Sequence, residues 1–234
     1  HRARAVAPDL LAGLDAAPPP SPPPAPPRLA RADLLLLEQQ PDTILGRKNP
    51  WGGGSATHVH ADLIAEAVLD RPWAEFEAAH RSARSRSEER RRETVLARDH
   101  AVTFAMPTDP AERLALVDEI VARRAGWLRA RGFSPIDDAP GLDFLRRLAL
   151  AEGPDGPVAR LSVLRIDGEF AAGSLCLVQA GRQDAIILGI GDGPWGRYTP
   201  GQLLLTRMLR HAAGTGLTRF GFGVGENELK ARWT

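Results

Sequence analysis

The sequence is short of cysteine, of lysine and of long apolar runs. Its 234 residues include a single cysteine, Cys176, which excludes a disulfide framework and a multi-cysteine zinc site. The longest apolar stretches, such as Leu34 to Leu37, fall far short of the roughly 18 residues that a membrane-spanning helix requires. We therefore expect no transmembrane segment, and a lone thiol fits a reducing, cytoplasmic compartment.

Neither sign of charge dominates the chain. Lys and Arg number 30 against 29 Asp and Glu, a net charge of +1, so there is no global attraction to nucleic acid. Lysine occurs only at positions 48 and 230, and this bias toward arginine is typical of a GC-rich bacterial genome. With 43% hydrophobic and 25% charged residues, the composition is that of a globular protein of one or two domains.

The first seventy residues contain few continuous elements. Pro18 to Pro27 predicts a stiff polyproline segment, because proline lacks the backbone donor that a helix or sheet uses. Asp33 to Glu38 predicts a buried strand, and a second strand is expected around Thr57 to Ile64. The glycines at 52 to 54 are not followed by a helix with Lys and Ser or Thr, so they do not indicate a phosphate-binding loop.

A long helix is predicted from Pro72 to Arg98, because Pro72 suits a first helical position and no breaker follows. Arginine and glutamate alternate along Arg81 to Glu93, which favours a solvated face with ion pairs between successive turns. A surface that contacts phosphate groups or tRNA is the alternative for the same residues.

The remainder has a regular plan. Strand patterns cover 100–106, 158–166, 170–179, 184–190 and 217–222, and helix patterns cover 109–132, 141–152 and 199–214. Asp109-Pro-Ala-Glu112 supplies a helix cap with a capping-box glutamate, and Asp167-Gly168 and Ala180-Gly181 predict tight turns. The predicted order is β-α-α-β-β-β-α-β.

This order and several motifs resemble the GNAT-like acyltransferase family of the cellulose-biosynthesis (CelD/BcsL) type, which is related to the FemAB peptidyltransferases. The motifs are the hairpin from Arg160 to Gly181, Tyr198-Thr-Pro-Gly-Gln-Leu-Leu-Leu205, Gly216 to Phe222 and Gly225 to Trp233. The resemblance implies an α/β (α+β) fold with a mixed, mostly antiparallel sheet flanked by helices. Two positions depart from the family pattern, Gly221 for an Asp and Leu229 for a Tyr.

The resemblance also implies a domain plan. Residues 1–70 are then the end of a first GNAT-like lobe, residues 71–98 a linking helix, and residues 99–234 a second lobe that stops before the usual final helix and strands.

A donor site follows from the same resemblance. The strands on either side of the 199–214 helix diverge in GNAT folds, so that backbone groups at 187–190 and 220–223 can pair with a pantetheine arm. The helix start offers free N–H groups and a positive dipole end to the diphosphate of coenzyme A. The implied donor-binding residues are Leu188, Gly189, Ile190, Arg197, Thr199, Pro200, Gly201 and Gln202. A helix that is simply capped at Thr-Pro-Gly is the alternative.

Acyl transfer to an amine requires a base, because an amine of pKa about 10.4 is protonated at neutral pH. Glu226, and after it Glu228, suit this role by position, and Tyr198 suits protonation of the departing thiolate unless it simply packs beside the helix start. Lys230 matches the family's lysine and is a candidate for holding a phosphate or carboxylate, the alternative being an exposed cation.

The other reactive side chains point less clearly to chemistry. His58 and His60 alternate on one strand, but no third ligand is near in sequence, so we expect no metal site. Cys176 lies in an apolar strand and is expected to be a buried, inert thiol.

The sequence therefore predicts an enzyme, a bacterial GNAT-type N- or O-acyltransferase. It would move an acyl group from acyl-CoA (acetyl-CoA) to an amine or hydroxyl of a cell-envelope or polysaccharide precursor. A FemAB-like transfer from aminoacyl-tRNA and a catalytically silent binding module are the alternatives. The acceptor and the oligomeric state do not follow from the sequence.

Overall fold

One mixed sheet with helices on both faces forms the centre of the computed structural model, which describes residues 43–44, 47–48, 64–135, 137–153, 156–224 and 228–233. Its strands are β3 (Ile64–Val68), β4 (Val102–Ala105), β7 (Ala159–Ile166), β8 (Glu169–Gln179), β9 (Arg182–Ile190) and β10 (Arg219–Val224). Their order is β3-β10-β9-β8-β7-β4, and every neighbouring pair is antiparallel except β9 and β10. The predicted fold class is confirmed.

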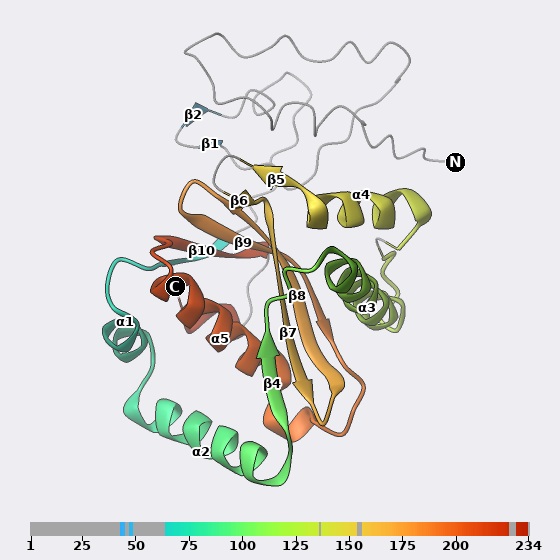
Figure 1. Ribbon diagram of the computed structural model, residues 1–234. Helices are drawn as coiled ribbons and strands as arrows, with labels where there is room; N and C mark the ends of the chain where they lie inside the picture. The colour runs from blue at the N-terminus through green and yellow to red at the C-terminus, as the bar shows by residue number, and fades with distance from the viewer. Residues whose placement is uncertain are drawn as a thin grey trace.

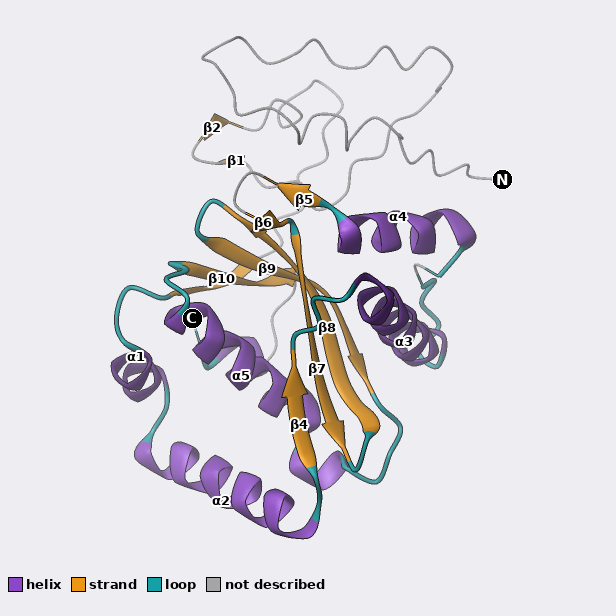
Figure 2. Cartoon of the chain, viewed as in Figure 1, coloured by secondary structure: helices purple, strands orange, loops and turns teal. Residues whose placement is uncertain are grey.

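The helices form two layers (Figures 1 and 2). On one face lie α3 (Pro110–Arg129) and α4 (Ala139–Leu150), and on the other lie α1 (Trp73–His80), α2 (Ala83–Asp99) and α5 (Pro200–Gly214). Each layer encloses its own apolar core, because alternate residues of a strand point to opposite faces. The short elements are β1 (Thr43–Ile44), β2 (Arg47–Lys48), β5 (Glu152–Gly153), β6 (Gly156–Pro157), α6 (Glu228–Ala231) and a 3₁₀ turn at Gly196–Tyr198.

Local signals place most of these elements where the sequence predicts them. Asp109 caps α3 by accepting a hydrogen bond from the Glu112 amide, and Gly132 ends the helical region with a φ of +76°. Both central residues of the turns at 167–168 and 180–181 have positive φ, the conformation that suits two-residue hairpins. The predicted element order from 100 to 222 is therefore confirmed.

The single helix predicted from Pro72 to Arg98 is wrong, because the chain breaks at Arg81 and Ser82. Arg81 is extended, with φ −135° and ψ 133°, and Ser82 begins α2 by accepting a hydrogen bond from the Ser85 amide. The break places the Arg81 guanidinium against Glu89, 2.7 Å away, with both side chains buried. A buried ion pair thus sets the angle between two helices that the sequence pattern joins.

The N-terminal part of the chain contributes to the same sheet. β3 pairs antiparallel with β10, Ala67 opposite Phe220, and Ala67 and Leu69 are buried in the core. β3, which lies before the predicted boundary near residue 70, is therefore part of the same sheet as the strands after it, and the division of the chain into two lobes stays a prediction. The polyproline segment, the strand at 33–38, the glycines at 52–54 and most of the strand predicted at 57–64 lie outside the described residues.

Candidate acyl-transfer site

The parallel strands β9 and β10 separate after three residue pairs. Arg219, Phe220 and Gly221 lie opposite residues 182–184 of β9. β10 then turns away toward β3, with Val224 opposite Ile64, and Gly223 takes a φ of +75°. Residues 185–190 of β9 therefore keep β8 on one side, and no strand of the described chain pairs with their other side.

Free backbone groups were predicted on both strands, and the structure has them on β9 but only in part on β10. On β9, residues 187–190 have the free edge that the sequence analysis assigned to them. On β10, Phe220 and Gly221 pair with β3 and β9 at once, so these two are not free to pair with a ligand. This part of the prediction is wrong, because β3 takes the place at the outer side of β10.

A β-bulge at Ile186 lies just beyond the point of separation. Cys176 of β8 faces Ala185, whereas the neighbouring Leu175 faces Ile187, so Ile186 is the extra residue. Ile186 is 46% exposed, and Ile190 at the far end of the strand is 37% exposed. The open edge is thus accompanied by apolar side chains that are not covered.

The start of α5 lies against the far end of this open stretch. A Cβ at Gly201 would lie 2.6 Å from Ile190 Cδ1 and 4.0 Å from Leu188 Cδ2, so a larger residue here would require the Ile190 side chain to shift. Thr199 precedes the helix in a left-handed conformation, φ 51°, and its side chain makes no capping bond. The amides of Gln202 and Leu203 donate to the Thr199 carbonyl, so some of the N–H groups predicted to be free at the helix start already have a hydrogen-bond partner.

A large groove adjoins the other side of the same helix start. It encloses about 1280 Å³ between α2 and the 197–202 segment. Its lining contains six arginines and two carboxylates, an excess of four positive charges before His80 is counted. The arginines are Arg81, Arg91, Arg92, Arg98, Arg197 and Arg232, and the acids are Glu88 and Asp99. Such a groove suits a ligand with several negative charges.

Several contacts fix α2 against α5 along this groove. Arg92 donates to Thr199 Oγ1 at 3.3 Å, and Gln202 Nε2 donates to the buried Glu89 carboxylate at 3.1 Å. The predicted solvated face of α2 is therefore divided, with some charges binding within the protein and others lining the groove. The sequence shows the arginines but not the contact of Arg92 with Thr199.

The remaining predicted donor residues fall around the same place. Pro200 is buried at the first helical position, and Gly189 is buried against α3. Arg197 stacks over the Tyr198 ring and donates to its hydroxyl at 2.6 Å. All eight predicted donor-binding residues thus belong to the last part of β9 or to the loop and first turn of α5.

The predicted catalytic residues are less closely grouped. Tyr198 is buried in the core and lines the arginine groove. Lys230 is half-buried in α6 and donates to the Gly223 carbonyl at 3.2 Å, and burial lowers its pKa, with a further contribution from Arg124. Glu226 lies outside the described residues, as does the side chain of Glu228. Their roles stay predictions.

A group of charges that the sequence analysis missed lies where β9 and β10 separate. Asp184 accepts from Arg182 at 2.6 Å, and Glu66 of β3 binds both Arg182 and Arg219. The register places Asp184 opposite Leu177, on the face that α3 covers. A Cβ on Gly221 would overlap the Asp184 carboxylate. A carboxylate thus occupies the space beside Gly221, although a neighbouring strand supplies it.

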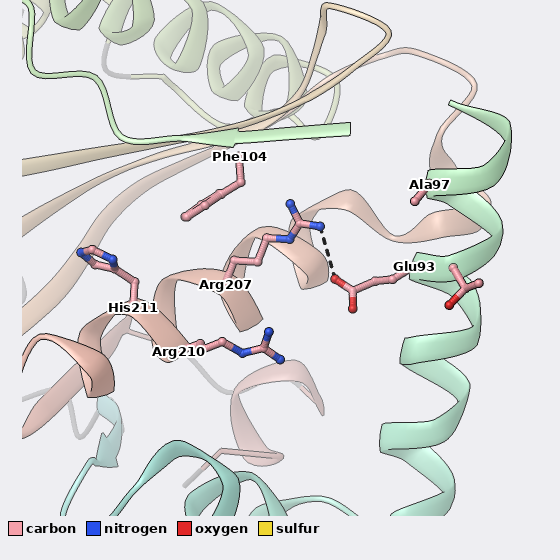
Figure 3. Close-up of a pocket in the computed structure, with 7 residues that line it drawn as sticks. Glu93, Ala97, Phe104, Arg207, Arg210 and His211 are labelled. Atoms are coloured by element: carbon pink, nitrogen blue, oxygen red, sulfur yellow. Dashed lines mark hydrogen bonds and ion pairs between the residues drawn. The ribbon is translucent and has the colours of Figure 1, made fainter. Parts of the chain in front are cut away.

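A second pocket, of about 650 Å³, lies between α2, α5 and β4 (Figure 3). Phe104, Arg207, Arg210 and His211 point into it, but its arginines are already engaged. Arg207 pairs with Glu93 at 3.4 Å, and Arg210 lies 5.5 Å over the ring of Trp73. Burial lowers the pKa of His211. This pocket resembles a packed helix junction more than a binding site.

Other candidate groups have structural explanations or lie outside the described part. Cys176 is fully buried, and burial raises the pKa of its thiol to about 11, as expected for an inert thiol. Within the described ranges, no cluster of three His, Cys, Asp or Glu side chains is arranged to hold a metal ion. His58 and His60 lie outside those ranges. None of the described helices is long and apolar enough to cross a membrane.

The comparison with protein families decides the assignment of this fold. Residues 83–231 match the family described as acetyltransferase (GNAT) domain, which is more than half of the chain. The chain belongs to this GNAT family. The separation of its strands, the bulge and the helix start at Pro200 and Gly201 are therefore parts of a GNAT domain. The match does not reach the level of the CelD/BcsL subtype.

Among solved structures, FemX has a similar fold, with a TM-score of 0.54 at 14% identity over 70% of this chain and 53% of the FemX chain. The C-terminal domain of a lysylphosphatidylglycerol synthetase from Agrobacterium fabrum has a TM-score of 0.45 at 18% identity, over 69% and 46% of the two chains. An aminoglycoside acetyltransferase from an uncultured soil metagenomic sample, in complex with sisomicin, reaches 0.36 at 16% identity, over 50% and 72%.

These structures inform the fold alone, and the two TM-scores below 0.5 carry no further conclusion. The GNAT chain spans about half the length of FemX. No curated protein matches it.

Proposed function

We propose that this GNAT domain transfers an acyl group from acyl-CoA to an amine or hydroxyl group of an acceptor. The observation that carries the proposal is the unpaired edge of β9 from 185 to 190, which runs from the charged group at Asp184 to the start of α5. A pantetheine arm carries amide groups that can pair with such an edge as a strand does. At about 3.3 Å per residue the stretch is on the order of 17 Å long, enough for an extended arm.

The positive charges at the α5 end of this edge suit the diphosphate of coenzyme A. The positive end of α5 and the arginines of the groove favour a diphosphate, because anions are stabilised at a helix N-terminus and by guanidinium groups. Arg92 donates to Thr199 at the helix start, and Arg197 lies two residues before Thr199 in the chain. We assign the donor's phosphates to this end and its acyl group to the end near Asp184.

The acceptor is then placed on the α3 face, near the point where the strands separate. A neutral amine is needed there, so a base has to take up a proton, and Glu226 is our candidate for that role. Asp184 is a second carboxylate, which lies beside Gly221 where the strands separate and is held in place by Arg182. The resemblance to the CelD/BcsL type supports a cell-envelope or polysaccharide precursor as the acceptor.

Calorimetry with acetyl-CoA tests the donor assignment. We expect saturable binding that weakens about tenfold or more in Arg92→Gln and in Arg197→Gln, because each removes a charge-assisted contact with phosphate. Arg90→Gln is the matched control, since Arg90 lies on α2, is exposed and does not line the groove. Absence of heat and of any thermal shift at millimolar acetyl-CoA would favour the silent binding module instead.

A FemAB-like transfer from aminoacyl-tRNA is the second candidate, and the excess of four positive charges in the groove favours it specifically. A nucleic acid that neutralises several arginines binds with a steep dependence on salt. If this candidate is right, we expect a tRNA gel shift at low salt that disappears as the salt concentration rises. The double variant Arg91→Gln and Arg92→Gln should weaken that shift. Lack of a shift at low salt excludes it.

A further inference from the structure

A second group of arginines lies on α3 and just after its end at Arg129, on the opposite face of the sheet from the groove. Arg124 and Arg131 both stack on the ring of Trp127, with guanidinium carbons 4.5 Å and 4.0 Å from the ring centroid. Trp127 is 41% exposed, and Arg131 is also held by a hydrogen bond to the Trp127 carbonyl at 3.4 Å. Stacking holds the two cations in place and leaves their N–H edges available.

Other arginines at this end of α3 are neutralised, but these two are not. Arg123 pairs with Asp192 and Arg129 pairs with Asp137. Within the ranges that the structure describes, no ion pair joins Arg124 or Arg131 to a carboxylate. Burial, and then the charge of Arg131, lower the pKa of Arg124. Two like charges are thus held on one ring, an arrangement that an anion would stabilise.

This group lies beside the open edge of β9. A Cβ on Gly189 would lie 2.8 Å from the Ile120 carbonyl oxygen and 3.3 Å from Arg123 Cβ, so α3 packs directly on the open stretch. Arg124 is the next residue of the helix, and Trp127 follows three residues later, about 4.5 Å further along the helix axis. Lys230 of α6 is within electrostatic reach of Arg124.

We propose that Arg124 and Arg131, stacked on Trp127, bind an anionic group of the acceptor, a phosphate or a carboxylate, and so hold the acceptor on the α3 face of the open strand edge. The inference rests on the proposed acyltransferase function, and it adds the class of acceptor. The donor's phosphates bind on the α5 face and the acceptor's anion on the α3 face, so both ligands reach the same edge without competing for one set of arginines.

The test measures binding of small probes by calorimetry at low ionic strength, with the groove on the α5 face saturated by coenzyme A. The probes are glucose 1-phosphate for a phosphate, glucuronate for a carboxylate, and glucose as the neutral reference. We expect saturable binding of one anionic probe and none of glucose. In Arg124→Gln combined with Arg131→Gln the dissociation constant should rise at least about tenfold.

Arg129→Gln is the matched control, because it removes one charge from the same helix without touching Trp127, and it should leave the constant within about twofold. Equal binding by the double variant and the wild type overturns the inference, as does an equal loss in the control. Absence of saturable probe binding also overturns it. Acetyl-CoA affinity, measured in parallel, reports the proposed function separately and should not change in the double variant.

Discussion

At the scale of single residues, Gly221 determines where the charged side chains around it can lie. Its lack of a side chain leaves the space that the Asp184 carboxylate occupies, and Asp184 in turn binds Arg182. The sequence pattern marks this position as the loss of a family aspartate. In the structure the carboxylate of Asp184, on the neighbouring strand β9, lies beside this position.

Gly221→Ala should therefore destabilise the protein by about 1–3 kcal/mol, because the new methyl group overlaps Asp184 and disturbs its pairing with Arg182. Chemical denaturation measures the change. Gly126→Ala is the control, since Gly126 is an exposed helical residue with open space around it, and there alanine should stabilise by up to about 1 kcal/mol. Equal stability of Gly221→Ala and the wild type would contradict the account.

At the scale of elements, the junction of α1 and α2 depends on one buried charge pair. Arg81 binds Glu89 across the break, lies 5.2 Å from the ring of Trp233, and contacts Glu77 as well. Glu89 also accepts from Gln202 of α5. The same carboxylate thus joins α2 to the helix break and to the start of α5, where we place the donor.

Glu89→Ala should cost about 3 kcal/mol of unfolding free energy, because it leaves the Arg81 guanidinium buried without its closest carboxylate. Glu88→Ala, one residue away but exposed and paired with Arg84, should change it by less than about 0.5 kcal/mol. Denaturation of both variants decides the point, and similar losses in the two would show that burial of the pair is unimportant.

At the scale of the whole molecule, β3 connects the N-terminal part of the chain to the GNAT sheet. It covers the outer edge of β10, buries Ala67 and Leu69, and supplies Glu66 to two arginines. β10 stays paired with β3 up to Val224, whereas its pairing with β9 ends at Gly221, and this leaves open the edge on which the proposed function depends.

A chain that starts at residue 71 should consequently be less stable than one that starts at residue 60, by at least about 2–5 kcal/mol, the usual cost of removing one large core side chain. Thermal unfolding of the two shortened chains provides the measurement. The longer one should retain acetyl-CoA binding, and the shorter one should lose affinity as β10 loses its outer partner. Identical melting temperatures would mean that β3 does not hold β10.

Much of the fold follows from local signals in the sequence. The cap at Asp109, the turns at 167–168 and 180–181, and the proline and glycine at the start of α5 each determine their element within a few residues. The eight predicted donor residues lie close together for the same reason, because they fall within fifteen positions of the chain around one strand end and one helix start.

What the sequence by itself determined is thus the order of elements and the GNAT family, and it predicted a donor site, since these depend on contacts between near neighbours. Only the tertiary structure decided that β3 pairs with β10, that Asp184 fills the space beside Gly221, and that Arg92 meets Thr199. These contacts join residues up to 160 positions apart, as Ile64 and Val224 are. Strand pairing and buried charge pairs are selected by packing of the whole chain, which no local pattern of residues records.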